Sequence, residues 1–236
     1  MANGDVFRGY AFIVGAMKCG TSTLHHLLRQ HPQIAEGKKK ELNYFCRWVA
    51  PTPEPYERRA FPELDKTRHV YTLDSSPNYA KAMVSPEVPG RIAEMPGHKR
   101  LIYLMRNPVD RIESHLTHTS TREREVDERL IDIAVDTSRY AHQLDCFASV
   151  GLLKDMLLLD FDELVARPHE VANEVFVFLG ISPFQVELDR PHNLRRTEEK
   201  YTSIAEDQRF AELVRDDVRQ LIERYKFEPA RKWGIA

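Results

Sequence analysis

The chain has 236 residues, of which 42% are hydrophobic and 30% charged, and its formal net charge at pH 7 is -2. These values describe a globular protein with one sizeable core, so we expect a single domain over residues 1–236. The net charge excludes the broad basic field that general nucleic-acid binding requires.

Two further features concern the cellular environment. The three cysteines, Cys19, Cys46 and Cys146, are odd in number and lack the spacing of a metal site. We therefore expect no disulfide framework, and reduced thiols in a cytoplasmic protein. The apolar run at residues 10–17 is too short to span a bilayer and is followed by no secretory cleavage site, so we expect no membrane span.

The first half of the chain alternates between strand and helix. Residues 11–14 predict a buried strand and residues 21–30 a helix that ends before Pro32, because a residue preceding proline disfavours the helical conformation. The four prolines between residues 51 and 62 predict an irregular surface segment. Residues 69–73 form a short strand candidate.

The pattern continues with a helix that Ser85 and Pro86 open and that ends near Met95. The second half is then predicted in chain order as follows: a buried strand at 100–105, a helix from Pro108, charged helices through 123–150, a buried strand at 156–160, a helix at 168–179, a loop-rich segment at 180–201 and an amphipathic helix at 207–225.

Near-continuous apolar strands that alternate with helices are typical of a parallel sheet covered on both faces. We therefore predict a three-layer α/β/α fold with a central parallel sheet. The loops that follow residues 14 and 105 then share the carboxyl edge of that sheet, where ligands of such folds bind.

The segment GAMKCGTST, residues 15–23, joins the first predicted strand to its helix. A glycine-bearing loop in this place directs backbone N–H groups and the positive end of a helix dipole at one point, which favours an anion. Lys18 adds a cation, and the hydroxyls of Thr21, Ser22 and Thr23 add donors. The segment predicts a phosphate site, although some strand–helix turns of this kind bind nothing.

The order of residues in this loop differs from that of nucleotide triphosphatases. Their pattern is G-x-x-x-x-G-K-[ST], whereas Lys18 precedes Gly20 here. Asp160 is a weak candidate for a metal partner. We therefore expect the phosphate ligand to be bound without a metal ion.

The spacing of this loop resembles the 5′-phosphosulfate loop of sulfotransferases that use 3′-phosphoadenosine 5′-phosphosulfate (PAPS). The resemblance extends from about residue 11 to about residue 180 and is strongest to the bacterial and Golgi-type carbohydrate enzymes. Three further segments match in order: 39–45 (KKELNYF), 73–79 (LDSSPNY) and 104–118 (LMRNPVDRIESHLTH).

The resemblance implies the P-loop-like sulfotransferase fold and PAPS as cofactor, with 3′,5′-adenosine bisphosphate (PAP) as its product and no metal. It implies that Glu41 is the catalytic base, and Lys40 is expected to orient Glu41 or to contact the sulfuryl oxygens. Lys18 is expected to stabilise the charge that develops on the bridging oxygen as the S–O bond breaks. The residues expected to bind the cofactor are Lys18, Cys19, Gly20, Thr21, Ser22, Thr23, Arg106, Ser114, Arg195 and Lys200.

Within this set, Arg106 and Ser114 match the 3′-phosphate segment, and Arg195 and Lys200 the basic loop that closes over the cofactor. That loop lacks the glycine common in the family, and Ser75 stands where some relatives carry lysine. The expected acceptor is a hydroxyl, less commonly an amine, of a small molecule or carbohydrate. No motif names the acceptor or the oligomeric state.

Several alternatives remain open at this point. Arg111 could bind the 3′-phosphate in place of Arg106, or could pair with Asp110 or Glu113. His115 or His118 could serve as the base. The chain could also be a P-loop kinase, a nucleotide hydrolase, or a nucleotide-binding module without catalysis.

Overall fold

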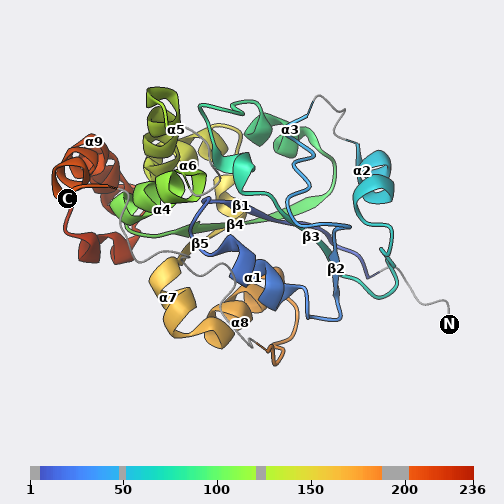
Figure 1. Cartoon of the computed structure of the whole chain (residues 1–236). Helices are drawn as coiled ribbons and strands as arrows, with labels where there is room; N and C mark the ends of the chain where they lie inside the picture. The colour runs from blue at the N-terminus through green and yellow to red at the C-terminus, as the bar shows by residue number, and fades with distance from the viewer. Residues whose placement is uncertain (1–5, 48–51, 121–125, 188–201) are drawn as a thin grey trace.

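The computed structural model describes residues 6–47, 52–120, 126–187 and 202–236. At its centre lies one parallel sheet with the strand order β2-β3-β1-β4-β5 (Figure 1). The strands are β1 (Gly9–Gly15), β2 (Ile34–Glu36), β3 (Tyr71–Ser75), β4 (His98–Met105) and β5 (Met156–Asp160).

The strands form where the sequence is apolar without interruption. Every residue of β1 and β3 is buried, as expected for strands that are covered on both faces. The predictions for β1, β4 and β5 are confirmed. β3 begins at Tyr71 rather than at His69, because His69 N donates to Asp65 O (2.7 Å) in a turn. β2 was not predicted, since its three residues are too few to produce a period.

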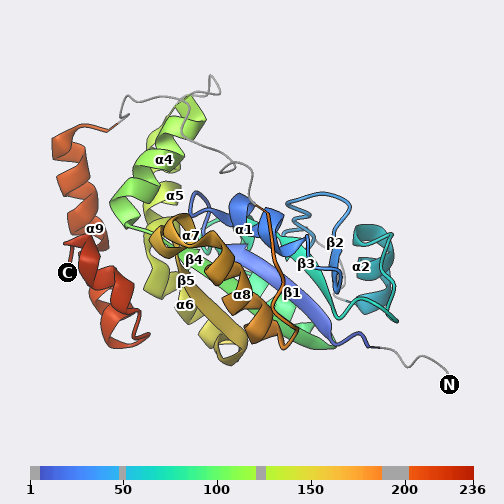
Figure 2. The same cartoon turned by 90° about the horizontal axis from the view of Figure 1, so that it is seen from below.

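Helices cover both faces of the sheet. Those described are α1 (Thr21–Leu28), α2 (Pro53–Ala60), α3 (Val88–Glu94), α4 (Pro108–Ser120), α5 (Glu128–Ser138), α6 (Tyr140–Ala148), α7 (Phe161–Ala166), α8 (Pro168–Leu179) and α9 (Ile204–Glu223). Figure 1 shows α1, α7 and α8 below the sheet and α3 to α6 above it, and Figure 2 shows α1, α7 and α8 in front of the strands. The three-layer prediction is confirmed. None of the described helices is both long and apolar enough to cross a bilayer.

Two helical predictions were wrong. The proline-rich segment contains α2, because Pro53 and Pro55 occupy its first turn, where the backbone N–H groups have no helical acceptor. The helix predicted from Ser85 begins instead at Val88, since the N–H groups of Val84 and Ser85 are engaged by the carbonyl of Lys81 in a turn.

The topology brings three chain segments to one edge. β1 lies between β3 and β4, and all three strands run in the same direction. The segments that follow them therefore emerge at the same carboxyl edge: the loop at 16–20, the turn at 76–80 and the start of α4. Ser76 N donates to Ile13 O (3.1 Å), which ties the first two together.

Close packing at this edge is tested by Gly15→Ala. A Cβ at Gly15 would lie 2.6 Å from Cε2 of the fully buried Tyr103 and 3.0 Å from Cβ of Ala80. We expect the free energy of unfolding to fall by about 1–3 kcal/mol, because the ring cannot move without disturbing the core. Urea denaturation followed by circular dichroism measures this.

Gly90→Ala is the matched control. An added Cβ there meets nothing within 4 Å, and Gly90 lies inside α3, so alanine should stabilise the protein by roughly 0.5–1 kcal/mol. Equal effects of the two substitutions would contradict the packing argument.

Candidate functional site

The loop between β1 and α1 has a fixed backbone. Ala16 N donates to Leu104 O (2.8 Å), which ties the loop to β4. Lys18 and Gly20 adopt left-handed conformations with φ of 71° and 83°. A Cβ at Gly20 would lie 3.1 Å from Cδ2 of Phe161 on α7, so glycine is required here for both its backbone freedom and its small size.

The amino end of α1 opens toward this loop. Its first intrahelical hydrogen bond runs from Leu24 N to Gly20 O (3.0 Å), so the N–H groups of Thr21, Ser22 and Thr23 have no acceptor within the helix. This first turn contains no acidic residue. Free N–H groups, the helix dipole and three hydroxyls together form a site for an anionic ligand.

Cys19, expected to contact the cofactor, turns its side chain into the core. The thiol is fully buried, and its Sγ lies 3.6 Å from Oη of Tyr140. Burial raises the pKa of this thiol. Its backbone N–H donates to Ala16 O (3.2 Å), so Cys19 shapes the loop from inside.

Arg106 lies directly after β4 and reaches the loop. Its Nη1 donates to the carbonyl of Lys18 (3.4 Å), and its guanidinium stacks on Phe161 with Cζ 4.6 Å from the ring centroid. The carboxylate of Asp110, four residues further along the chain, lies 3.7 Å from Nη2 of Arg106, but this carboxylate is exposed. An exposed pair of this kind is worth little, so the guanidinium remains available to a phosphate beside the loop.

Arg111 is fully buried beneath the loop. It donates to Met17 O (3.3 Å), to Oγ of Ser138 (2.5 Å) and to Ala134 O. The predicted pairing with Asp110 or Glu113 is not found, since Asp110 faces Arg106 and Glu113 accepts from Thr117 and Thr202. Arg111 thus supports the loop from below. Ser114, one turn further along α4, is half-buried.

His115 packs against Arg111. Its Nδ1 lies 3.4 Å from Nη2 of the guanidinium, and only 4% of the residue is exposed. Burial, followed by the charge of Arg111, lowers the pKa of His115 to about 2. A neutral imidazole buried in the core is not placed to take a proton from a substrate hydroxyl, which weakens His115 as a candidate base.

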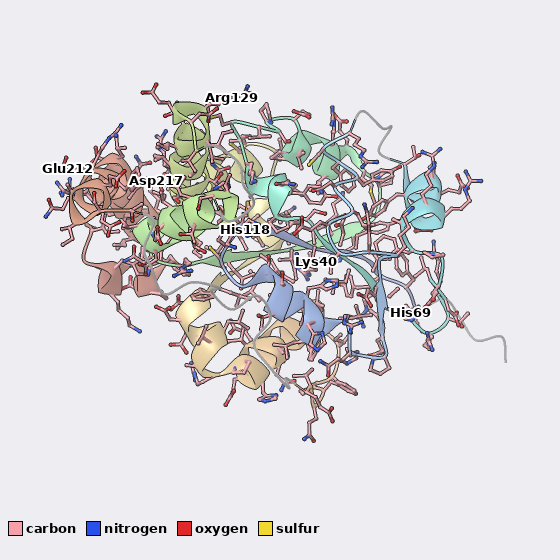
Figure 3. All side chains as sticks on the ribbon, in the orientation of Figure 1. Lys40, His69, His118, Arg129, Glu212 and Asp217 are labelled. Atoms are coloured by element: carbon pink, nitrogen blue, oxygen red, sulfur yellow. The ribbon has the colours of Figure 1, made fainter. Side chains whose placement is uncertain are left out.

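Glu41 is held at the end of β3. Its N–H donates to Ser75 O (3.0 Å), and its φ is 62°. Its carboxylate is 49% exposed and forms an ion pair with Nζ of Lys40 (2.8 Å). The structure therefore places Glu41 at the edge that the phosphate loop occupies, two strands away from Arg106. In Figure 3, Lys40 lies beside α1.

A buried carboxylate organises the segment around Glu41. Asp74 accepts hydrogen bonds from Ser76 (2.6 Å), Tyr79 (2.7 Å) and Tyr56 (3.1 Å). The hydroxyls of Ser76 and Tyr79 in turn accept from Asn43 N and Tyr44 N (both 2.9 Å). Burial raises the pKa of Asp74. This network fixes the chain just after Glu41.

Three charged residues of this region were not predicted from the sequence: Asp74, Arg111 in its supporting role, and Lys81. Lys81 is 8% exposed, and its Nζ lies 3.1 Å from Sδ of Met17 in the loop. The available signal for Asp74 was its place in the segment LDSSPNY (73–79), directly after an apolar strand residue, but none marked Lys81. Arg195 and Lys200 lie outside the described residues.

Residues considered for metal binding have other roles. Asp160 caps α7 by accepting from Asp162 N (3.2 Å). Among residues 6–47, 52–120, 126–187 and 202–236, no group of three or more His, Cys, Asp or Glu side chains is arranged to hold a metal ion.

Comparisons with known proteins agree with this architecture. A family model described as "Sulfotransferase domain" matches residues 9–221. Heparan sulfate glucosamine 3-O-sulfotransferase 3B1 from Mus musculus is 29% identical over 185 residues, which cover 72% of this chain and 46% of that enzyme. The chain therefore spans less than half the length of this relative.

Two solved structures share the fold. A sulfotransferase from Alicyclobacillus acidocaldarius superposes with a TM-score of 0.75 at 24% identity, covering 95% of this chain and 99% of that one. Mouse sulfotransferase SULT7A1 complexed with PAP gives a TM-score of 0.55 at 15% identity, covering 97% of this chain and 90% of that one.

The burial of His115 predicts a pH dependence of stability. Its folded pKa is lowered to about 2, whereas the unfolded value is about 6.5. As the pH falls below the unfolded value, the unfolded chain binds a proton that the folded chain excludes, so stability is lost at about 1.4 kcal/mol per pH unit. Between pH 7.5 and 5, His115→Asn should show a decline in unfolding free energy that is about 2 kcal/mol smaller than in the parent.

Urea denaturation at pH 7.5, 6.0 and 5.0 measures the difference. The exposed His169 supplies the control, and His169→Asn should follow the parent curve. If His115→Asn also follows the parent curve, the imidazole is not held neutral by its surroundings.

Proposed function

Because the chain belongs to the sulfotransferase domain family, we propose that it transfers the sulfuryl group of PAPS to a hydroxyl of a small-molecule or carbohydrate acceptor, and less commonly to an amine. One observation carries the proposal: the anion site at α1 and the guanidinium of Arg106 share the carboxyl edge of β1 and β4. The name of the mouse relative describes sulfation of a sugar hydroxyl, which supports the class of acceptor.

In this proposal PAPS binds with its two charged ends on neighbouring strands. The loop N–H groups and the hydroxyls of Thr21, Ser22 and Thr23 hold the 5′-phosphate. Arg106 and Ser114 hold the 3′-phosphate, which ATP lacks; a guanidinium binds phosphate through two parallel charge-assisted hydrogen bonds. The PAP in the similar mouse structure supports this class of ligand.

The transfer step uses Glu41 and Lys18. The acceptor oxygen forms a bond to sulfur while the bond from sulfur to the bridging oxygen breaks, and the electron pair stays on PAP. The acceptor proton passes to the carboxylate of Glu41, which is a competent base because the hydroxyl becomes acidic as its bond to sulfur forms. Lys18 stabilises the charge that gathers on the bridging oxygen.

We also propose that the protein is cytoplasmic. Cys19, Cys46 and Cys146 are free thiols, which supports a reducing environment such as the cytoplasm.

The nucleotide assignment predicts that PAP raises the melting temperature equally with and without Mg²⁺. Arg106→Ala should weaken PAP binding about 10- to 100-fold, as expected for lost hydrogen bonds to a charged group, and should leave AMP binding unchanged. Differential scanning fluorimetry and titration calorimetry measure both effects.

Arg100→Ala is the control for this substitution, since Arg100 lies near the amino end of β4, away from Arg106, which follows the carboxyl end, and pairs with Asp155. Stabilisation by ATP with Mg²⁺ and not by PAP would identify a kinase or nucleotide hydrolase instead.

The base assignment predicts that Glu41→Gln lowers kcat about 10²- to 10⁴-fold, because glutamine cannot accept the proton. Binding of PAP should not change. Transfer from ³⁵S-labelled PAPS to a panel of phenols, monosaccharides and glucosamine oligosaccharides measures turnover. Glu54→Gln, an exposed substitution on α2, should keep parental turnover, and an equally active Glu41→Gln would remove Glu41 from its role.

A further inference from the structure

Lys81 occupies an unusual position at the carboxyl edge of β3. It follows the 3-10 turn Pro77–Ala80 and is 8% exposed. Its Nζ lies 3.1 Å from Sδ of Met17, the residue that precedes Lys18 in the phosphate loop. A lysine from another part of the chain thus reaches the loop beside Lys18, the residue proposed to stabilise the charge on the bridging oxygen.

The backbone around Lys81 is fixed from several sides. Its carbonyl accepts from Val84 N (2.9 Å) and Ser85 N (2.8 Å). The next residue is also fixed, since Ala82 N donates to Oε1 of Gln143 on α6 (2.9 Å). The held main chain fixes where the side chain starts, and its burial against the loop keeps Nζ beside Met17.

The ammonium group is buried without a good acceptor. Among the described residues, its hydrogen-bond partner is the thioether of Met17, which is a weak acceptor. Burying a charge in this way is costly unless a counter-charge arrives. Burial lowers the pKa of Lys81 to about 8, the charge of Arg111 adds to this effect, and Glu41 opposes it. Lys81 is therefore close enough to both residues to interact with their charges.

The neighbouring hydroxyl on β3 cannot supply the same contact. Ser75 ends β3 and carries no charge, and its Oγ lies 2.7 Å from Nδ1 of the buried His25. Lys81 is thus a buried cation that contacts the loop through Met17 and interacts with the charge of Glu41.

We propose that Lys81 binds the sulfuryl oxygens of PAPS while the group passes from the phosphate to the acceptor. This inference rests on the proposed function, in which the loop holds the 5′-phosphate and Glu41 faces the acceptor. The group must then travel between these two points, and Lys81 contacts Met17 of the loop and lies close enough to Glu41 to interact with its charge. The ammonium exchanges a thioether for charged oxygens and keeps its proton, since the acceptor proton goes to Glu41.

The comparison of PAPS with PAP tests this contact, because the two ligands differ only by the sulfuryl group. Titration calorimetry without acceptor gives both dissociation constants for the parent, Lys81→Met, Lys81→Arg and Lys99→Met. Lys99→Met is the control. Lys99 is a half-buried lysine near the amino end of β4, away from the carboxyl edge, and its Nζ donates to Ala93 O (3.2 Å).

We expect Lys81→Met to weaken PAPS binding on the order of tenfold or more, as for the loss of a hydrogen bond to a charged group, and to change PAP binding less than about threefold. Lys81→Arg should restore part of the loss, and Lys99→Met should change neither constant. Retained PAP binding also shows that Lys81→Met is folded.

Two results would overturn the inference by itself. In one, Lys81→Met weakens the binding of PAP and of PAPS by the same factor, which would show that Lys81 acts through a general electrostatic or structural effect. In the other, it changes neither constant. If the parent binds neither nucleotide, the proposed function fails and this inference fails with it, so the two failures are distinguishable.

Discussion

A buried positive charge supports the loop at residues 16–20 on the carboxyl edge of the sheet. The guanidinium of Arg111 is inaccessible to solvent and is hydrogen-bonded to Met17 O, Ser138 Oγ and Ala134 O. These oxygens give each guanidinium nitrogen a partner but do not neutralise the charge, and burial lowers the pKa of Arg111. A buried ion is expensive without a counter-charge. Together with the α1 dipole, Arg111 makes the region above it electrostatically favourable for an anion.

A separate buried hydrogen-bond network around Asp74 supports the segment that carries Glu41. Asp74 accepts from three hydroxyls, and two of these hold the backbone after Glu41. Glu41 itself sits in a left-handed conformation beside Lys40. The arginines on the β1–β4 side, Arg106 and Arg111, and the carboxylate of Glu41 on the β3 side are thus held by different elements, with β1 between them. A donor phosphate and an acceptor hydroxyl need such an arrangement, because one is stabilised by cations and the other must lose a proton.

The predictions from sequence succeeded and failed for identifiable reasons. β1, β4 and β5 were found because their apolar runs are long and end at turn residues. β2 and α7 were missed because three and six residues are too few to show a period. α2 was misjudged because prolines were counted as breakers, although a first turn tolerates them. Arg106 was placed correctly beside the loop, whereas the expected partners of Arg111 were wrong because its neighbours on α4 face elsewhere.

The sequence by itself determined the strand–loop–helix order around residues 9–28, the parallel sheet and the arginine after β4, because these depend on local apolar runs, glycine conformations and helix ends. Only the tertiary structure decided which charged side chains are buried beside that loop. Met17 meets Lys81 across 64 residues and Arg111 across 94. A lysine or arginine has the same side chain wherever it occurs, and its role here comes from the burial and the partners that packing brings to it from distant parts of the chain.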